Sequence, residues 1–219
     1  MNRRNYQKEL ERIIEQNGEK KPSVLLHSCC GPCSSSVLEY LTRYFRVTVL
    51  WYNPNLYPEE EYFRRLETQK ELLCKMELSE QVGLLVIPWQ SEKYYKAVAG
   101  YENEPEGGRR CEKCFELRLQ ECARIAKSGN FDYFCSTLTV SRHKNAVLIN
   151  RIGENEGEKE EVCWLPSDFK KHNGENRSVE LSEKYGIYRQ VYCGCEFSLK
   201  ARMQPKKQEL TERKDTENE

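Results

Sequence analysis

Cysteine residues gather at one turn near the start of the chain, where Cys29, Cys30 and Cys33 fall within residues 24–36 (VLLHSCCGPCSSS). The segment begins as a short apolar run typical of a buried strand, and its serines can cap a helix expected over about 37–44. A strand-to-helix turn lies at the carboxyl end of a parallel sheet, where open α/β folds bind their ligands. Thiols at the start of a helix have a lowered pKa, so these cysteines are suited to binding a metal ion or attacking a substrate.

A second pair, Cys111 and Cys114, has the CxxC spacing at the start of another predicted helix. Together with Cys29 and Cys30, this pair offers four thiolates, the usual ligand set of an iron–sulfur cluster or of a structural zinc ion. Directly adjacent cysteines suit one tetrahedral zinc ion poorly but can reach different irons of a cluster. The alternative is that these residues are small buried side chains of a cysteine-rich core.

A third pair, Cys193 and Cys195, is separated by a single glycine. Such a pair can close a strained disulfide, which is the labile kind, and can hold two electrons as a dithiol. It could equally supply two more metal ligands. Cys33 could be a fifth ligand, for a second metal, or a bystander. We interpret the remaining cysteines as core or surface residues: Cys74, Cys122, Cys135 and Cys163.

Several other polar and aromatic residues give weaker signals. Arg109 and Arg110 directly precede the CxxC pair and suit a phosphate or an anionic substrate, although a solvated basic loop has the same composition. Asp168 could supply an acid, a metal ligand or only surface charge. Tyr192 is one of several aromatic residues at strand ends and in loops that could stack on a base, although packing is the commoner role for each one singly.

Composition narrows the class of protein. The chain has 219 residues and a formal net charge of zero, so no overall field draws it to nucleic acid, although a local basic patch remains open. Its 11 cysteines form an odd, clustered set that argues against a secreted disulfide scaffold. Neither a signal peptide nor a run of membrane-spanning length is evident, and we expect a cytoplasmic protein with no membrane partner.

The order of predicted elements indicates an α/β fold with a mostly parallel sheet and helices on both faces. Strands are expected in the apolar run that opens residues 24–36, then at 46–52, 84–88 (as a buried strand), 132–136 and 164–165. Helices are expected at 5–16, 37–44, 58–78, 91–99, 111–127, 143–152 and 178–185. We expect one metalloenzyme domain over 1–203 and a disordered, charged tail over 204–219.

Taken together, the motifs resemble those of the QueH-type epoxyqueuosine reductases. The resemblance runs in the right order from about residue 22 to 200, with Gly31 where the family more often has alanine. The segments that carry it are LLHSCCGPCS (25–34), WYNPNLYPEEEYFRR (51–65), GRRCEKCFELRL (108–119), STLTVSRHKN (136–145), SDFKK (167–171) and YRQVYCGCEFS (188–198).

This resemblance implies a fold similar to the nucleotide α-hydrolase-like (Rossmann-like) group. It also implies the last step of queuosine formation in tRNA, in which the epoxide of the modified wobble base is reduced to an alkene with loss of water. The family carries a [4Fe–4S] cluster with an iron ion nearby and needs no cobalamin. By motif, the cluster ligands would be Cys29, Cys30, Cys111 and Cys114, and Cys193 with Cys195 would form a redox-active disulfide.

Several roles stay open within this resemblance. The adjacent iron could be held by Cys33, by Asp168 or by one of the Cys193–Cys195 thiols, and Tyr192 or Asp168 could deliver a proton. Arg109 and Arg110 would meet tRNA phosphates. The electron donor is not evident from the sequence. Two rival interpretations are an ATP-using enzyme of the tRNA thiolation type and a structural zinc module that binds tRNA or protein.

Overall fold

The structure is a computed structural model that describes residues 4–204. Of the predicted charged tail, residues 205–219 lie outside this range, so the predicted division into a domain of 1–203 and a tail stays a prediction. Within residues 4–204, no helix is both long enough and apolar enough to cross a bilayer.

Five parallel strands form a single sheet in the order β3-β2-β1-β4-β5. Helices flank the sheet, so the predicted fold class is confirmed. β1 is central, and its Leu26 lies opposite Val49 of β2 and Cys135 of β4. The strands are β1 (Ser23–His27), β2 (Arg46–Trp51), β3 (Gly83–Val86), β4 (Tyr133–Ser136) and β5 (Cys163–Trp164).

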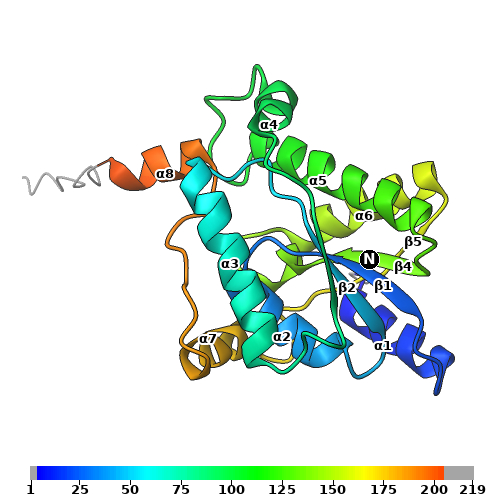
Figure 1. Cartoon of the computed structure of the whole chain (residues 1–219). Coiled ribbons are helices and arrows are strands. Elements are labelled where there is room, and N and C mark those ends of the chain that lie inside the picture. The colour runs from blue at the N-terminus through cyan, green and yellow to red at the C-terminus, as the bar shows by residue number, and fades with distance from the viewer. Residues whose placement is uncertain (1–3, 205–219) are drawn as a thin grey trace, which may run out of the picture.

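Helices α5 and α6 cover one face of the sheet, and α2, α3 and α7 lie on the other (Figure 1). The element after β4 is a short 3-10 helix, η1 (Thr137–Val140), where the sequence predicts a loop. The helices are α1 (Tyr6–Asn17), α2 (Gly31–Leu41), α3 (Glu59–Lys75), α4 (Ser91–Val98), α5 (Arg109–Ser128), α6 (Ala146–Glu160), α7 (Gly174–Lys184) and α8 (Glu196–Met203).

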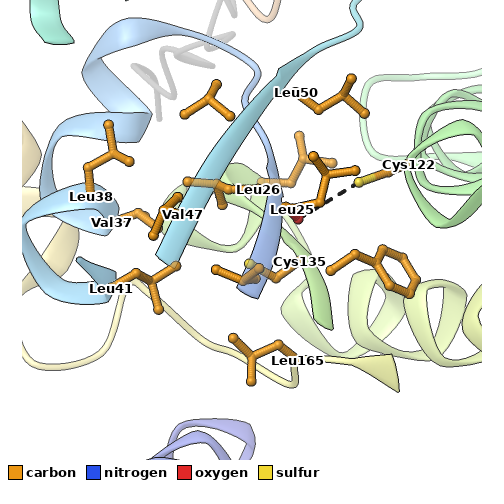
Figure 2. Packing of buried hydrophobic residues seen from close by; sticks show 14 of the residues in the cluster. Leu25, Leu26, Val37, Leu38, Leu41, Val47, Leu50, Cys122, Cys135 and Leu165 are labelled. Atoms are coloured by element: carbon orange, nitrogen blue, oxygen red, sulfur yellow. Dashed lines mark hydrogen bonds between the residues drawn. The ribbon is translucent and has the colours of Figure 1, made fainter. Parts of the chain in front are cut away.

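The main core lies between the central strands and the helices on either side. Figure 2 shows Leu25 and Leu26 of β1 among residues of β2 and α2, and Cys122 of α5 and Cys135 of β4 belong to the same cluster. Complete burial of one such leucine contributes about 1.5–3 kcal/mol. The packing interpretation of Cys122 and Cys135 is therefore confirmed, while Cys74 and Cys163 lie at the surface.

The first helix after the cysteine turn begins six residues earlier than predicted. Its N-cap is Cys30, whose Sγ accepts a hydrogen bond from the backbone N–H of Cys33 at 3.4 Å, and Pro32 occupies the first turn, where proline is favoured. Ser34 lies inside the helix, with its hydroxyl oxygen 3.0 Å from the Cys30 carbonyl oxygen. The serines are therefore buried helix residues rather than caps, and the cysteines stand at the helix start.

The prediction of a buried third strand is wrong. Among the described strands β3 pairs with β2 alone, and Leu85 and Val86 are 41% and 40% exposed. A strand at the edge of a sheet lacks the second neighbour that would cover it. Its apolar sequence resembles that of a central strand, so periodicity could not separate the two cases.

The strand order creates a switch point beside β1. From β1 the chain moves outward through β2 to β3, and it then returns to the other side of β1 as β4. The carboxyl ends of β1 and β4 therefore lie next to each other and lead into the cysteine turn and into η1. Open α/β sheets bind their ligands at such a switch point.

Candidate metal centre and redox site

Three sulfur atoms meet at this switch point. The Sγ atoms of Cys29, Cys30 and Cys33 all lie within 4.8 Å of one another, and those of Cys29 and Cys30 are 3.8 Å apart. From the β4 side, Thr137 accepts a hydrogen bond from the backbone N–H of Cys29 at 3.2 Å and lies 3.4 Å from its sulfur. Thiolates this close together are the ligands that iron, iron–sulfur clusters and zinc prefer.

A buried network of hydrogen bonds fixes the cysteine turn to neighbouring elements. Ser28 and Ser34 each donate to Gln69 Oε1 of α3 at 2.8 Å, and Asn53 donates to the Ser28 carbonyl at 2.8 Å. A Cβ atom on Gly31 would lie 2.9 Å from Cγ2 of Thr68, so α2 and α3 approach closely here. The turn is thus fixed by β2 and α3 as well as by its own strand and helix.

A second group of thiols comes from α5 and from the loop before α8. Cys111 and Cys114 sit in the first turns of α5, and Cys114 packs with Cys195 in a small apolar cluster around Tyr94. Burial raises the pKa values of both helix cysteines, and the nearby Cys193 and Cys195 raise them further. The structure therefore brings the CxxC and CGC pairs together.

The four predicted cluster ligands do not all lie close together in this arrangement. Among the described residues, the sulfur atoms that meet within 4.8 Å are those of Cys29, Cys30 and Cys33, and this group does not include Cys111 or Cys114. Cys33 is therefore nearer to the first pair than the CxxC thiols are. The assignment of Cys29, Cys30, Cys111 and Cys114 as ligands stays a prediction.

The loop that carries Cys193 and Cys195 is anchored to α3, beside which it runs in Figure 1. Arg65 of α3 donates to the carbonyls of Cys193 at 3.1 Å and Tyr192 at 3.3 Å, and its Nε donates to Glu61 at 2.7 Å. Both cysteines of the pair are free thiols. Because Arg65 binds backbone carbonyls, it holds the loop through its main chain, while the Cys195 sulfur accepts from the backbone N–H of Ser198 at 3.4 Å as the N-cap of α8.

Gly194 is required by this anchoring. It has a φ of +127°, and its carbonyl accepts from the backbone N–H of Tyr57 at 2.8 Å. A Cβ atom at this position would lie 2.5 Å from Leu56 Cδ2 and 2.9 Å from Arg65 Nη1. Only glycine combines this backbone conformation with so close an approach.

A cavity of about 1070 Å³ opens onto both groups of cysteines. Its wall includes Cys29 and Cys33 from the switch point and Cys193 from the anchored loop. Arg65, Lys144, Arg189 and Arg202 also line it, against the carboxylates of Glu106 and Glu175. The cavity is therefore a thiol-lined chamber with more fixed positive than negative charge.

Neighbouring thiols of the cysteine turn differ in pKa because their surroundings differ. Hydrogen bonds from the Cys30 and Cys33 thiols, helped by the charge of Lys144, hold the pKa of Cys29 well below its usual range. Burial raises the pKa of Cys30 to about 12, and the hydrogen bonds to Cys29 and Cys30 raise that of Cys33. One thiolate next to two thiols is an arrangement that a metal ion would convert into a full set of thiolate ligands.

Sequence reasoning missed three cations beside the thiols: Arg65, Arg118 and Lys144. Burial alone would lower the pKa of Lys144, but the charges of Cys193, Cys29, Cys33 and Cys30 raise it. All three residues lie inside the motifs 51–65, 108–119 and 136–145, and this position was the one signal in the sequence that could have indicated a role at the site. Without such a motif, a charged residue on a predicted helix or loop is expected to be a surface residue.

The sequence pattern of the family described as Epoxyqueuosine reductase QueH matches residues 24–201, most of the chain. The chain belongs to this family. The Epoxyqueuosine reductase QueH of Streptococcus pyogenes serotype M1 is 41% identical over 200 residues, covering 90% of this chain and 78% of the relative. That of Staphylococcus epidermidis is 42% identical over 201 residues (89% and 84%), and that of Thermotoga maritima is 36% identical over 180 residues (81% and 90%).

A solved structure shares the fold. The U34-tRNA thiolase NcsA from Methanococcus maripaludis, determined with its [4Fe–4S] cluster, superimposes with a TM-score of 0.51 at 12% sequence identity. The match covers 88% of this chain and 67% of the thiolase. At this identity the likeness shows a common α/β architecture.

Of the two predicted proton donors, one lines the cavity. Tyr192 does so, but its hydroxyl donates to the Tyr57 carbonyl at 2.5 Å, and burial raises its pKa to about 12. Asp168 follows β5 and pairs with Lys170 at 3.0 Å, and it is not among the described residues that line the cavity. Tyr192 is therefore the better placed of the two.

The two predicted phosphate-binding arginines differ sharply. Arg110 is only 5% exposed, donates to the carbonyls of Glu102 and Glu104, and lies over the ring of Phe197. Its guanidinium holds the loop before α5, so the structure does not support a phosphate contact by this residue. Arg109 is exposed, so it stays a candidate for a phosphate contact.

Proposed function

We propose that this chain is an epoxyqueuosine reductase, which reduces the epoxide of epoxyqueuosine in the tRNA anticodon loop to the cyclopentene of queuosine, the last step of that pathway. The observation that carries the proposal is the meeting of several thiols on one cavity at the sheet's switch point, in a chain whose family match spans residues 24–201. This match favours a reductase over an ATP-using thiolation enzyme and over a structural zinc module.

The residues present fit an iron–sulfur cofactor. Three thiols of one turn meet within 4.8 Å, and thiols of the CxxC and CGC pairs pack together in a second group. Buried Arg118 and half-buried Lys144 stand beside these thiols to offset negative charge. Cys29, Cys30, Cys111 and Cys114 would hold a [4Fe–4S] cluster, and Cys33 is the best placed candidate for an adjacent iron. Such a cofactor supplies single electrons and a Lewis acid, without cobalamin.

The reaction consumes two electrons and two protons: both epoxide C–O bonds break, a C=C bond forms and the oxygen leaves as water. The Cys193–Cys195 dithiol can supply both electrons and both protons as it closes to a disulfide. Arg65 and Gly194 fix the main chain of this pair, with Cys193 on the cavity wall and Cys195 buried behind it. A reductant of the dithiol type, or another electron donor, then restores the pair.

The cavity wall suits a substrate that carries phosphates. Its excess of basic side chains attracts a tRNA backbone, and the single-stranded anticodon loop can present its base without opening a duplex. Exposed Arg109 would extend this positive surface beyond the cavity. Because the substrate is tRNA, we place the protein in the cytoplasm.

The Cys193→Ser variant is expected to keep its iron and to lose multiple turnover, because the two-electron store is removed while the predicted cluster ligands stay intact. Iron content, visible absorbance and queuosine formed over time measure the two effects separately. Cys163→Ser, at an exposed position, is the matched control and should behave as wild type. Loss of the iron together with turnover would instead make Cys193 a ligand.

The Arg109→Ala variant is expected to weaken tRNA binding and to flatten its salt dependence by about 0.7–0.9 in the slope of log K against log salt, the value for one phosphate contact. Binding is measured by anisotropy over a series of salt concentrations. Arg12→Ala, an exposed change on α1, is the control. An unchanged slope in the Arg109 variant would place the phosphates elsewhere.

The test of the function is an anaerobic assay on tRNA that contains epoxyqueuosine. Protein reconstituted with iron and sulfide is incubated with this tRNA and dithionite, with no cobalamin present, and the nucleosides are then analysed by mass spectrometry. Queuosine should form with wild-type protein and not with metal-free protein. Unchanged epoxyqueuosine with a fully loaded protein would refute the proposal.

A further inference from the structure

Arg118 is an unusual charge in this fold. It is 2% exposed and lies on α5 one turn beyond Cys114, whose carbonyl accepts from its Nε at 3.2 Å. Its Nη2 atom is buried without a hydrogen-bond partner, and no carboxylate among residues 4–204 lies within 4.0 Å of its nitrogens. A buried guanidinium without an anion is costly, and the ring of Phe115, whose centroid is 5.7 Å from its Cζ, offsets only part of that cost.

The groups that Arg118 faces are thiols of the site, which would be negative once they bind a metal as thiolates. Positions 111, 114 and 118 follow the i, i+3, i+7 spacing of one helix face, which places the guanidinium on the same side of α5 as the CxxC pair. Its strongest charge interactions are with Cys114, Cys193 and Cys29, which come from three different segments. Arg118 therefore stands where the two groups of cysteines approach each other.

The other two cations beside the thiols have different surroundings. Arg65 is paired with Glu61, and its other nitrogens donate to the backbone carbonyls of Tyr192 and Cys193. Lys144 is half-buried on the cavity wall. Arg118 is fully enclosed and keeps a free donor, so it is suited to a permanent partner inside the protein.

We propose that Arg118 is the fixed internal counter-charge of the metal centre, with a guanidinium that offsets the negative charge of the cysteine-bound cluster and sets its reduction potential. The inference rests on the cofactor assigned under the proposed function. A thiolate-bound cluster gains negative charge when it is reduced. A buried positive charge stabilises the reduced form more than the oxidised form, because Coulomb interactions are strong in the interior. Arg118 is a positioning residue in this role and need not touch the substrate.

The test compares Arg118→Met, which removes the charge, with Arg118→Lys, which keeps it. Arg124→Met is the matched control, since Arg124 lies on the same helix in an exposed pair with Glu121. Two quantities are measured: the midpoint potential of the anaerobically reconstituted cluster and the thermal unfolding midpoint of the metal-free protein.

The potential of Arg118→Met should shift to more negative values, that of Arg118→Lys should lie nearer to wild type, and that of Arg124→Met should not move. Metal-free Arg118→Met should unfold at the same temperature as wild type or higher, because an unpaired buried charge has been removed. A stable metal-free Arg118→Met chain that no longer retains a cluster would also support the inference.

An unchanged potential in fully loaded Arg118→Met would overturn the inference. So would a lower unfolding temperature of metal-free Arg118→Met and Arg118→Lys alike, which would make the role purely structural. A wild-type chain that takes up no cluster would overturn it too, whatever the reductase assay shows. None of these measurements uses tRNA, so their failure is distinct from failure of the proposed activity.

Discussion

The Cys30→Ser variant is expected to lose most of its iron, its broad visible absorbance and its reductase activity. Cys30 is buried at the start of α2, its sulfur is 3.8 Å from that of Cys29, and it accepts from Gln190 Nε2 at 2.9 Å. A serine oxygen fits this space but is a hard, protonated donor that iron–sulfur chemistry does not favour. Cys29→Ser, Cys111→Ser and Cys114→Ser should lose iron in the same way.

Cys74→Ser is the control for this series, because Cys74 is exposed on α3 and should leave iron content unchanged. Cys33→Ser separates the predicted ligand set from the group of sulfurs that the structure brings together. Retention of the cluster in this variant, with loss of a single additional iron, assigns Cys33 to the adjacent iron. Full iron content in all four of the other serine variants would contradict the ligand assignment.

The second large effect is expected for Arg65→Met, which should destabilise the protein by about 3–5 kcal/mol. The Arg65 and Glu61 side chains are 2% and 8% exposed, so removal of the guanidinium leaves a buried carboxylate without its partner. The same change deletes both hydrogen bonds to the cysteine loop. Urea unfolding of the metal-free protein measures the loss of stability, and a fall in turnover should accompany it.

Two further variants test this account of Arg65. Lys70→Met breaks an exposed ion pair with Glu67 on the same helix and should cost no more than about 1 kcal/mol. The double variant Glu61→Gln, Arg65→Met should recover part of the stability but not the turnover, because the buried charge is gone while the loop stays unanchored. Equal stability of Arg65→Met and wild type would show that the buried pair contributes little.

The arrangement of the fold could be predicted because its signals are local. The apolar run of β1, the β-branched run of β2 and the glycine and proline breaks between elements determine strands and helices directly. What could not be predicted depends on neighbours. β3 is exposed because no strand within residues 4–204 pairs with its outer edge. α2 starts early because a thiol replaces the usual oxygen as its cap. α8 follows the CGC loop, and its eight residues are too few to show a helical period.

The site divides in the same way. Clustered cysteines are conspicuous in any sequence, so every thiol of the site was predicted. The cations were not, since nothing local distinguishes buried Arg118 from exposed Arg124 on the same helix. Arg110 was predicted to bind phosphate, whereas in the folded loop its guanidinium donates to the carbonyls of Glu102 and Glu104. The sequence alone does not show these contacts.

The most direct measurement is a single-turnover experiment with pre-reduced protein. The protein is reconstituted anaerobically, reduced, freed of excess reductant and mixed with an excess of epoxyqueuosine-containing tRNA, and the nucleosides and the thiol state are then analysed by mass spectrometry. The account predicts queuosine, lighter than its precursor by one oxygen atom, in an amount limited by the number of loaded chains, with Cys193 and Cys195 joined afterwards. Loaded protein that leaves the epoxide intact, or that forms queuosine while both thiols stay free, would contradict it.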